Sequence, residues 1–168
     1  LLAISGSIMH FMYKTMLFQA VGGVYSRTHD RRMYRMGGLI YKMPLTFIVV
    51  LIGIIAMSGV PPLTGFSGKW LSFNAILQKE YYLQGAAMTV AGAIAFLYLF
   101  RLIHAPFLGQ LKDHLRKVRE ANFWILLPQF LVVLSIMAFS TFPGLLLRRI
   151  GDMISTIFPD GALLWVNS

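Results

Sequence analysis

The chain has 168 residues, of which 57% are hydrophobic and only 12% are charged, and its formal net charge is +9. Soluble domains carry about 25% charged residues, so the composition excludes an ordinary soluble domain and indicates a membrane protein. Because the basic residues stand between apolar segments, the positive charge favours contact with a membrane surface over nucleic acid binding. Cysteine is absent, which excludes disulfides, thiolate metal sites and thiol nucleophiles in this chain.

The first predicted element is an apolar segment over residues 1–25, which is long enough to span a membrane, since about 20 residues cross the hydrocarbon core. Because residue 1 is leucine, where a native chain should begin with methionine, and already lies within an apolar segment, we expect a fragment, a processed product or the C-terminal portion of a longer protein. His10 and Lys14 are four residues apart and therefore share one face of a helix. The pair could relay protons through ordered water, because histidine exchanges protons readily near neutral pH. The alternative is that His10 only packs against its neighbours.

Two polar segments rich in lysine and arginine, residues 26–43 and 110–121, separate the apolar ones. We expect both to be loops whose basic side chains touch lipid headgroups. The pair Gly37-Gly38 is expected to end any short helix that the arginines of the first loop form.

Two further apolar segments, 85–108 and 123–147, are each long enough to span the membrane. The residues that follow, 148–168, are amphipathic and are expected to lie at the membrane interface. The predicted organisation is therefore a transmembrane domain over 1–147 and an interfacial tail.

Residues 44–77 form an apolar element that is interrupted in the middle. The residues that predict the break are Gly59, Pro61, Pro62, Gly65 and Gly68. Proline removes a backbone donor and clashes with the preceding turn, so two half-helices are expected. Lys69 follows the break directly, which is typical of a discontinuous membrane helix with a functional charge near the bilayer midplane. A simple kink, or a lysine that snorkels to the surface, is the alternative.

The free N–H groups at the start of the second half-helix are expected to add positive potential near Lys69. If 44–77 crossed the membrane twice, the two basic loops would lie on opposite sides. One interrupted crossing puts both on one side, as the positive-inside rule favours. The predicted fold is an all-α polytopic membrane bundle of about four transmembrane spans, with one discontinuous helix broken at Pro61-Pro62 and both basic loops facing the cytoplasm or matrix.

The chain shows no nucleotide-binding glycine loop, paired carboxylates or metal-ligand cluster, and its six acidic residues all fall outside the predicted spans. We therefore expect no metal site and no redox or hydrolytic chemistry within this polypeptide. Arg101 and His104 end the span over 85–108 and are secondary candidates for proton transfer. Their alternative role is to anchor the span at the interface.

Several motifs follow one another in an order that resembles a known family. They are His10-Phe11-Met12-Tyr13-Lys14, Thr28-His29-Asp30, Met36-Gly37-Gly38-Leu39 and Gly59-Val60-Pro61-Pro62-Leu63-Thr64-Gly65-Phe66-Ser67-Gly68-Lys69. The family is that of the antiporter-like proton-translocating membrane subunits of respiratory complex I, membrane-bound hydrogenases, formate hydrogenlyase and Mrp-type sodium/proton antiporters. The resemblance covers 1–109, is weaker beyond, and matches only the C-terminal portion of a complete member.

The resemblance implies that His10 and Lys14 link two half-channels and that Lys69 is the exit-side proton-transfer residue. Some members carry a further histidine one turn before His10, where this chain has Gly6. The first-repeat glutamate–lysine pair of the family has no counterpart here, so another stretch of polypeptide would have to supply that half.

The implied function is translocation of protons, or of another cation, as a subunit of a redox-driven complex such as an NADH:quinone oxidoreductase or a membrane-bound hydrogenase. The alternatives are a module of an Mrp-type antiporter or bicarbonate-uptake complex without redox partners, and a half-subunit that only scaffolds. Expected partners are the lipid bilayer, other membrane subunits and protons or sodium. Iron–sulfur, flavin, nickel–iron or quinone cofactors are expected only in partner subunits. A prokaryotic cytoplasmic membrane is favoured over the mitochondrial inner membrane.

Overall fold

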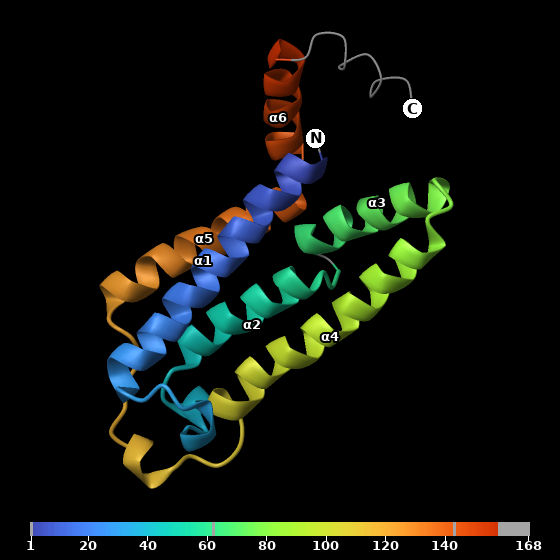
Figure 1. The fold of residues 1–168 in the computed structure, drawn as a ribbon. Coiled ribbons are helices and arrows are strands. Elements are labelled where there is room, and N and C mark those ends of the chain that lie inside the picture. Colours follow the sequence, from blue (N-terminus) through green and yellow to red (C-terminus); the bar gives the residue numbers. More distant parts are fainter. Residues whose placement is uncertain (1, 62, 143, 158–168) are drawn as a thin grey trace.

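The computed structural model describes residues 2–61, 63–142 and 144–157, and within these ranges the chain is all-helical (Figure 1). The α-helices are α1 (Leu2–Thr28), α2 (Pro44–Ser58), α3 (Thr64–Gln78), α4 (Tyr82–Phe107), α5 (Phe123–Thr141) and α6 (Gly144–Ile157), and the single-turn 3-10 helices are η1 (Met33–Arg35), η2 (Leu39–Tyr41) and η3 (Asp113–Leu115). The all-α prediction is confirmed for the described residues.

Two of the described helices, α4 and α5, are long and apolar enough to cross a membrane, with 26 and 19 residues. Most of their surface faces outward, as lipid-exposed helices require. The 27 residues of α1 are also sufficient in length, and α2 is apolar but has only 15. By length, α2 can therefore cross only together with another segment.

The predicted span over 123–147 is wrong at its C-terminal end, because α5 stops at Thr141 and a separate helix, α6, begins at Gly144. Phe142 precedes a proline in the sequence, and such a residue is biased away from helical dihedral angles. Its φ of −125° and ψ of 70° agree with that bias.

The helix α6 contacts α1 and lies at the end of the bundle opposite the basic loops (Figure 1). The predicted tail boundary at residue 148 falls inside α6, and residues 158–168 lie outside the described residues. The interfacial location of the tail stays a prediction.

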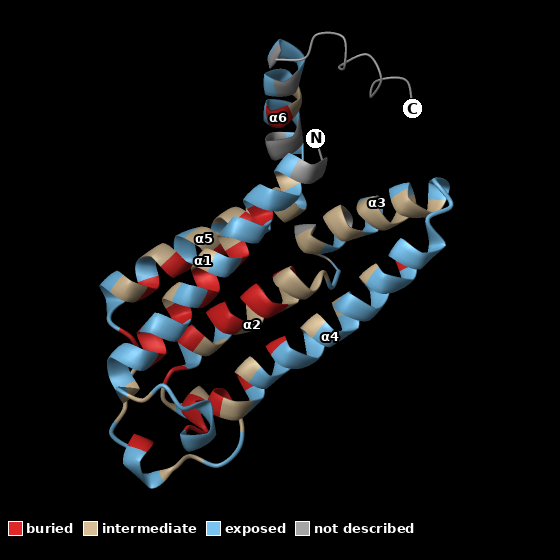
Figure 2. Ribbon diagram, in the orientation of Figure 1, coloured by how far each residue is buried: buried red, intermediate tan, exposed pale blue. Residues whose placement is uncertain are grey.

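The centre of the bundle is α2, which packs against α1, α3, α4 and α5 and carries many of the buried residues (Figure 2). Its sequence is apolar on all sides, as expected for an interior helix. Gly53 allows α1 to approach, since a Cβ at this position would lie 2.7 Å from Met16 Cε and 2.9 Å from Leu17 Cδ2. The most tightly enclosed part of the fold is thus the first half of the interrupted element.

The helices α2 and α3 follow one another along α4, so that together they extend from one end of α4 to the other. The N-terminal end of α2 meets the C-terminal end of α4, where the rings of Phe47 and Phe107 are 5.6 Å apart. The C-terminal end of α3 meets the N-terminal end of α4, because a Cβ on Gly85 would touch Phe73 and Leu77. α3 therefore does not fold back along α2, and the antiparallel α4 covers both half-helices (Figure 1). That α2 and α3 together make one crossing of the membrane stays a prediction.

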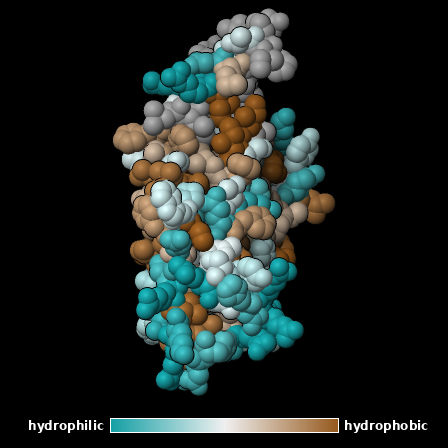
Figure 3. Space-filling view, turned by 90° about the vertical axis from the view of Figure 1, so that its left-hand side faces the viewer, coloured by the Kyte–Doolittle hydropathy of each residue, from teal (hydrophilic) through white to brown (hydrophobic). Residues whose placement is uncertain are grey.

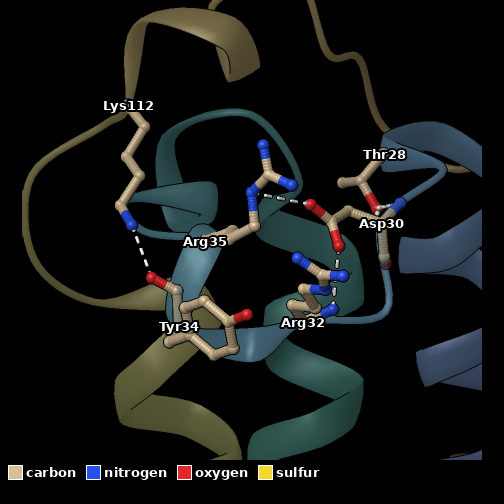
Figure 4. Close-up of polar contacts among 6 residues, drawn as sticks. All are labelled: Thr28, Asp30, Arg32, Tyr34, Arg35 and Lys112. Carbon is tan, nitrogen blue, oxygen red and sulfur yellow. Dashed lines mark hydrogen bonds and ion pairs between the residues drawn. The ribbon is translucent and has the colours of Figure 1, made fainter.

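Both basic loops lie at the same end of the bundle, where hydrophilic side chains gather (Figure 3). The Gly38 N–H donates to Leu108 O at 3.2 Å, and Lys112 Nζ donates to Tyr34 O at 2.6 Å (Figure 4). Gly38 has a φ of +66°, and a Cβ there would overlap the backbone of Leu111. The pair Gly37-Gly38 therefore allows the two loops to pack backbone to backbone, and it does not end the helix of the arginines, since η1 stops earlier at Arg35.

Asp30 organises the first basic loop. Its carboxylate accepts the Arg32 backbone N–H at 2.9 Å and pairs with Arg35 Nε at 3.5 Å (Figure 4). The Arg32 N–H and the nearby guanidinium charges hold the pKa of Asp30 below its ordinary value. Because the folded pKa is lowered, the stability that this carboxylate contributes is present above its unfolded pKa of about 3.9 and is lost as the pH falls through the lowered value.

We predict that hydrogen–deuterium exchange over residues 28–36, corrected for the intrinsic pH dependence of exchange, rises as the pH falls below about 4. In Asp30→Asn, the corrected exchange should already be at the fast level that the wild-type protein reaches only at low pH, and it should not change with pH. The reason is that the amide lacks the charge that holds Arg35. An equal pH dependence in the wild-type protein and Asp30→Asn would rule out this role for the carboxylate.

Candidate functional site

The break in the membrane element begins at Gly59, which ends α2 in a left-handed conformation with φ +74°. The Gly59 N–H donates to Ala56 O and the Val60 N–H donates to Ile55 O, each at 3.3 Å. This is a Schellman motif, in which glycine takes the left-handed position without steric cost. It satisfies two of the last four carbonyls of α2.

Lys69 satisfies the other two. Its Nζ donates to Met57 O and to Ser58 O, each at 2.9 Å, from the second turn of α3. Free carbonyls within a membrane cost several kcal/mol each, so these two bonds complete the end of α2. The ammonium also lies at the negative end of the α2 dipole. The Lys69 side chain reaches back across the break to the carbonyls of the other half-helix. The expectation that the free N–H groups of α3 add positive potential near Lys69 stays a prediction.

Two of the predicted break residues are glycine because the half-helices meet at very short distance. A Cβ on Gly65 would clash with Ala56 O, and a Cβ on Gly59 would lie 2.7 Å from Lys69 Cδ. A Cβ on Gly68, in contrast, would meet nothing within 4 Å.

The break itself is shorter than the pattern indicated. Gly65 and Gly68 lie within the first turns of α3, and Pro61 is exposed in the connecting turn. Pro62 lies outside the described residues. The described break is therefore set by the end of α2 at Gly59, ahead of the prolines.

We predict that Gly65→Ala strongly lowers the thermal stability of the purified protein, because the added methyl group collides with a backbone carbonyl that cannot move away. The matched control is Gly68→Ala on the same helix, which should keep stability or raise it by about 0.5–1 kcal/mol through helix propensity. Thermal-shift measurements on the purified protein distinguish the two. Equal effects of the two substitutions would contradict the close approach at Gly65.

Glu120 is a functional candidate that the sequence analysis did not single out. It comes from the second basic loop, and its carboxylate accepts the Leu45 N–H at 2.7 Å and the Thr46 hydroxyl at 2.6 Å. These groups belong to the first turn of α2, whose own N-cap residue, Met43, supplies no side-chain bond. An acid at a helix N-terminus is favoured by the helix dipole. α2 is thus held at its positive end by Glu120 and at its negative end by Lys69.

The sequence carries only a weak signal for this contact. Glu120 is a lone acid next to a run of basic residues. Its partners are 75 and 74 residues away, so no local spacing connects them.

We predict that Glu120→Gln destabilises the protein by about 1.5–3 kcal/mol, the range for hydrogen bonds to a charged group. The amide cannot accept bonds on both of its terminal atoms. The control Glu80→Gln, at the exposed turn between α3 and α4, should stay within about 0.5 kcal/mol. If chemical or thermal unfolding gave the same stability for both variants, Glu120 would not be a cap of α2.

His10 and Lys14 lie on one face of α1, and both are exposed. The face of α1 that packs into the bundle is instead formed by Tyr13, Met16 and Ala20. No hydrogen bond among the described residues joins either candidate to Lys69. The structure therefore keeps the predicted relay pair together but leaves it on an uncovered side of α1.

Arg101 and His104, the secondary candidates, are both exposed near the end of α4. The His104 ring lies 6.1 Å from that of Phe100, one turn earlier. Neither residue approaches the break, because this end of α4 meets the start of α2 and the basic loops.

Comparison with known proteins identifies the family. A family model described as "NADH:quinone oxidoreductase/Mrp antiporter, TM" matches residues 2–95. A Na(+)/H(+) antiporter subunit of Alkalihalophilus pseudofirmus is 30% identical over 182 aligned positions, which cover 98% of this chain and 23% of that protein. Formate hydrogenlyase subunit 3 of Escherichia coli is 30% identical over 110 positions, which cover 60% of this chain and 18% of that subunit.

Solved structures show the same fold. A chain of the membrane-bound sulfane sulfur reductase, described as an archaeal respiratory membrane complex, superposes with a TM-score of 0.81 at 31% identity, over 86% of this chain and 24% of that one. A chain of the Mrp complex from Dietzia sp. superposes with a TM-score of 0.75 at 19% identity, over 83% of this chain and 34% of its own length. The chain spans about a quarter of the length of the curated relatives it matches. It belongs to the NADH:quinone oxidoreductase/Mrp antiporter transmembrane family.

Proposed function

We propose that this chain forms part of a membrane subunit that translocates protons, or exchanges them for another cation, and that Lys69 is its proton-transfer residue. The observation that carries the proposal is the setting of Lys69 Nζ. It lies at the break of a membrane helix and is bound, among the described residues, by two backbone carbonyls and no carboxylate.

This setting suits reversible protonation. An ammonium group has three N–H donors, and two of them are used by Met57 O and Ser58 O. The third can be given up, and the neutral amine that remains still has two donors for the same carbonyls. Proton transfer therefore leaves the end of α2 intact. The Ser58 hydroxyl is buried with no partner among the described residues, so it offers a further polar group for water beside Lys69.

The proposed topology has four spans, formed by α1, by α2 and α3 together, by α4 and by α5. The single run of α2 and α3 along α4 supports it, as does the packing of both basic loops at one end of the bundle. By the positive-inside rule this end faces the cytoplasm of a prokaryotic cell.

His10 and Lys14 are proposed to pass protons toward Lys69 through water. Their exposed face on α1 would then be covered by other parts of a longer subunit, which fits the small fraction of each relative that this chain matches. The energy would come from neighbouring membrane subunits. Any iron–sulfur or nickel–iron group would lie in those partners, since this chain has no cysteine to hold a cluster, and flavin and quinone are assigned to the partners as part of the same proposal.

The second candidate function is that of an Mrp-type antiporter or bicarbonate-uptake module without redox partners. It is favoured by the alignment with the Na(+)/H(+) antiporter protein, which covers 98% of this chain, whereas the formate hydrogenlyase alignment covers 60%. Mass spectrometry of the affinity-purified complex separates the two, because subunits with iron–sulfur or nickel–iron centres would copurify only in the redox-driven case.

The test of Lys69 must separate proton transfer from helix capping. Lys69→Arg keeps a charged multiple donor at the carbonyls but cannot release a proton, because guanidinium stays protonated in proteins. We predict normal assembly with translocation reduced at least tenfold. Lys69→Met should lose translocation and also assemble poorly, since unpaired buried carbonyls cost about 1–3 kcal/mol each.

Translocation is measured by pH-sensitive dye quenching in proteoliposomes that hold the complete complex. Lys79→Arg, at the exposed end of α3, is the control and should behave as wild type. Wild-type translocation by a fully assembled Lys69→Arg complex would remove Lys69 from the proton pathway.

A further inference from the structure

An open pocket of about 660 Å³ lies where the end of α4 meets the two basic loops. It is lined by polar groups that include His104, Gln110 and Lys112, and by apolar groups that include Met36 and Leu108. Both parts of the structure contribute polar and apolar side chains: His104 and Ala105 come from the end of α4, whereas Met36, Lys112 and Asp113 come from the basic loops. Because α4 is long and apolar enough to cross a membrane, its end is the level where the hydrocarbon core would give way to the headgroups.

The wall of this pocket is built from tightly joined backbone. A Cβ on Gly37 would lie 2.8 Å from Gln110 O, so the two loops touch without a side chain between them. The Lys112 bond to Tyr34 O ties the second loop to η1 from the other side (Figure 4). The pocket is thus preformed by the fold and does not depend on a ligand to bring the loops together.

The loops around the pocket have a large excess of positive charge. Residues 26–43 and 110–121 contain nine lysine and arginine residues and three acidic ones. Each of the three acids already has a partner in the fold. Asp30 pairs with Arg35, Asp113 pairs with Arg116 at 3.0 Å, and Glu120 caps α2. Lys112 uses one of its three donors on Tyr34 O, so its charge remains available to an anion in the pocket.

An apolar stripe leads away from the pocket along α4. Phe100, Leu97, Ile94 and Val90 are all exposed, and they precede His104 at helical spacing. From Val90 to His104 the stripe is roughly 21 Å long at 1.5 Å per residue. That exceeds the thickness of about 15 Å of one leaflet's hydrocarbon. A molecule with an anionic headgroup in the pocket and hydrocarbon tails on the stripe would neutralise the positive charge of the pocket and cover the exposed apolar side chains of α4.

We propose that the pocket between the end of α4, η1 and the 108–113 loop binds the headgroup of an anionic phospholipid. Lys112 binds the phosphate of the lipid, and its acyl chains lie on the exposed stripe of α4. His104 lies between the two, where the headgroup joins the acyl chains. Basic pockets beside membrane helices have this lipid preference in general. A soluble anion would use the cationic rim but leave the stripe uncovered.

The test is native mass spectrometry of the purified complex after delipidation. The probes are phosphatidylglycerol, phosphatidylcholine with the same acyl chains, and inorganic phosphate. The wild-type complex should retain phosphatidylglycerol at least fivefold better than phosphatidylcholine, and millimolar phosphate should not displace it. Lys112→Gln should reduce this preference about fivefold, the effect of one basic residue near an anionic surface.

Two variants serve as controls for the fold and for general charge. Lys112→Arg keeps the cation and should retain the preference. Lys117→Gln removes an exposed cation of the same loop that does not line the pocket and should also retain it. Equal lipid retention by Lys112→Gln and Lys117→Gln would overturn the proposal. Displacement by phosphate would overturn it in favour of a free-anion site, and a partner's acidic segment found in the pocket would overturn it in favour of a protein contact.

Discussion

The central constraint on this bundle is how the backbone is satisfied where α2 ends and α3 begins. A helix end leaves four carbonyls without partners in the helix, and lipid would supply none. Here two of the four are bonded through the turn at Gly59, and the other two accept bonds from Lys69. The opposite end of the same helix receives the Glu120 carboxylate. The central helix is therefore held by a cation at its negative end and an anion at its positive end.

This arrangement gives Lys69 a structural task, and the proposed proton transfer would use the same nitrogen atom. The close approach that brings Nζ to the carbonyls requires glycine at 59 and 65, so the break and the lysine form one unit. Because two donors suffice for the structural task, the third proton is available for the proposed transfer. A guanidinium could perform only the structural task, so the proposed function needs a lysine here.

The basic end of the bundle is held by backbone contacts at Gly37-Gly38 and by bonds from charged side chains. The two loops are joined at Gly38 and at Lys112, and the few acids among the cations are all engaged. This leaves a positively charged surface of fixed shape beside the exposed apolar face of α4. Its connection to the break runs through Glu120, since that residue belongs to the second loop and caps the helix that ends at Lys69.

The sequence by itself determined the helical membrane class and the break of the helix near Gly59, and it singled out Lys69 as the residue to examine. These depend on composition, on proline and glycine, and on the cost of a charge in lipid, all of which are local properties. Only the tertiary structure decided what Lys69 binds, that His10 and Lys14 lie on an uncovered face, and that Glu120 closes the other end of α2. Each of these depends on which distant segments pack together, and no spacing along the chain specifies a contact between residues 45 and 120. The separate helix α6 was missed because apolar residues continue past the end of α5, although the proline after Phe142 is a local signal for the boundary.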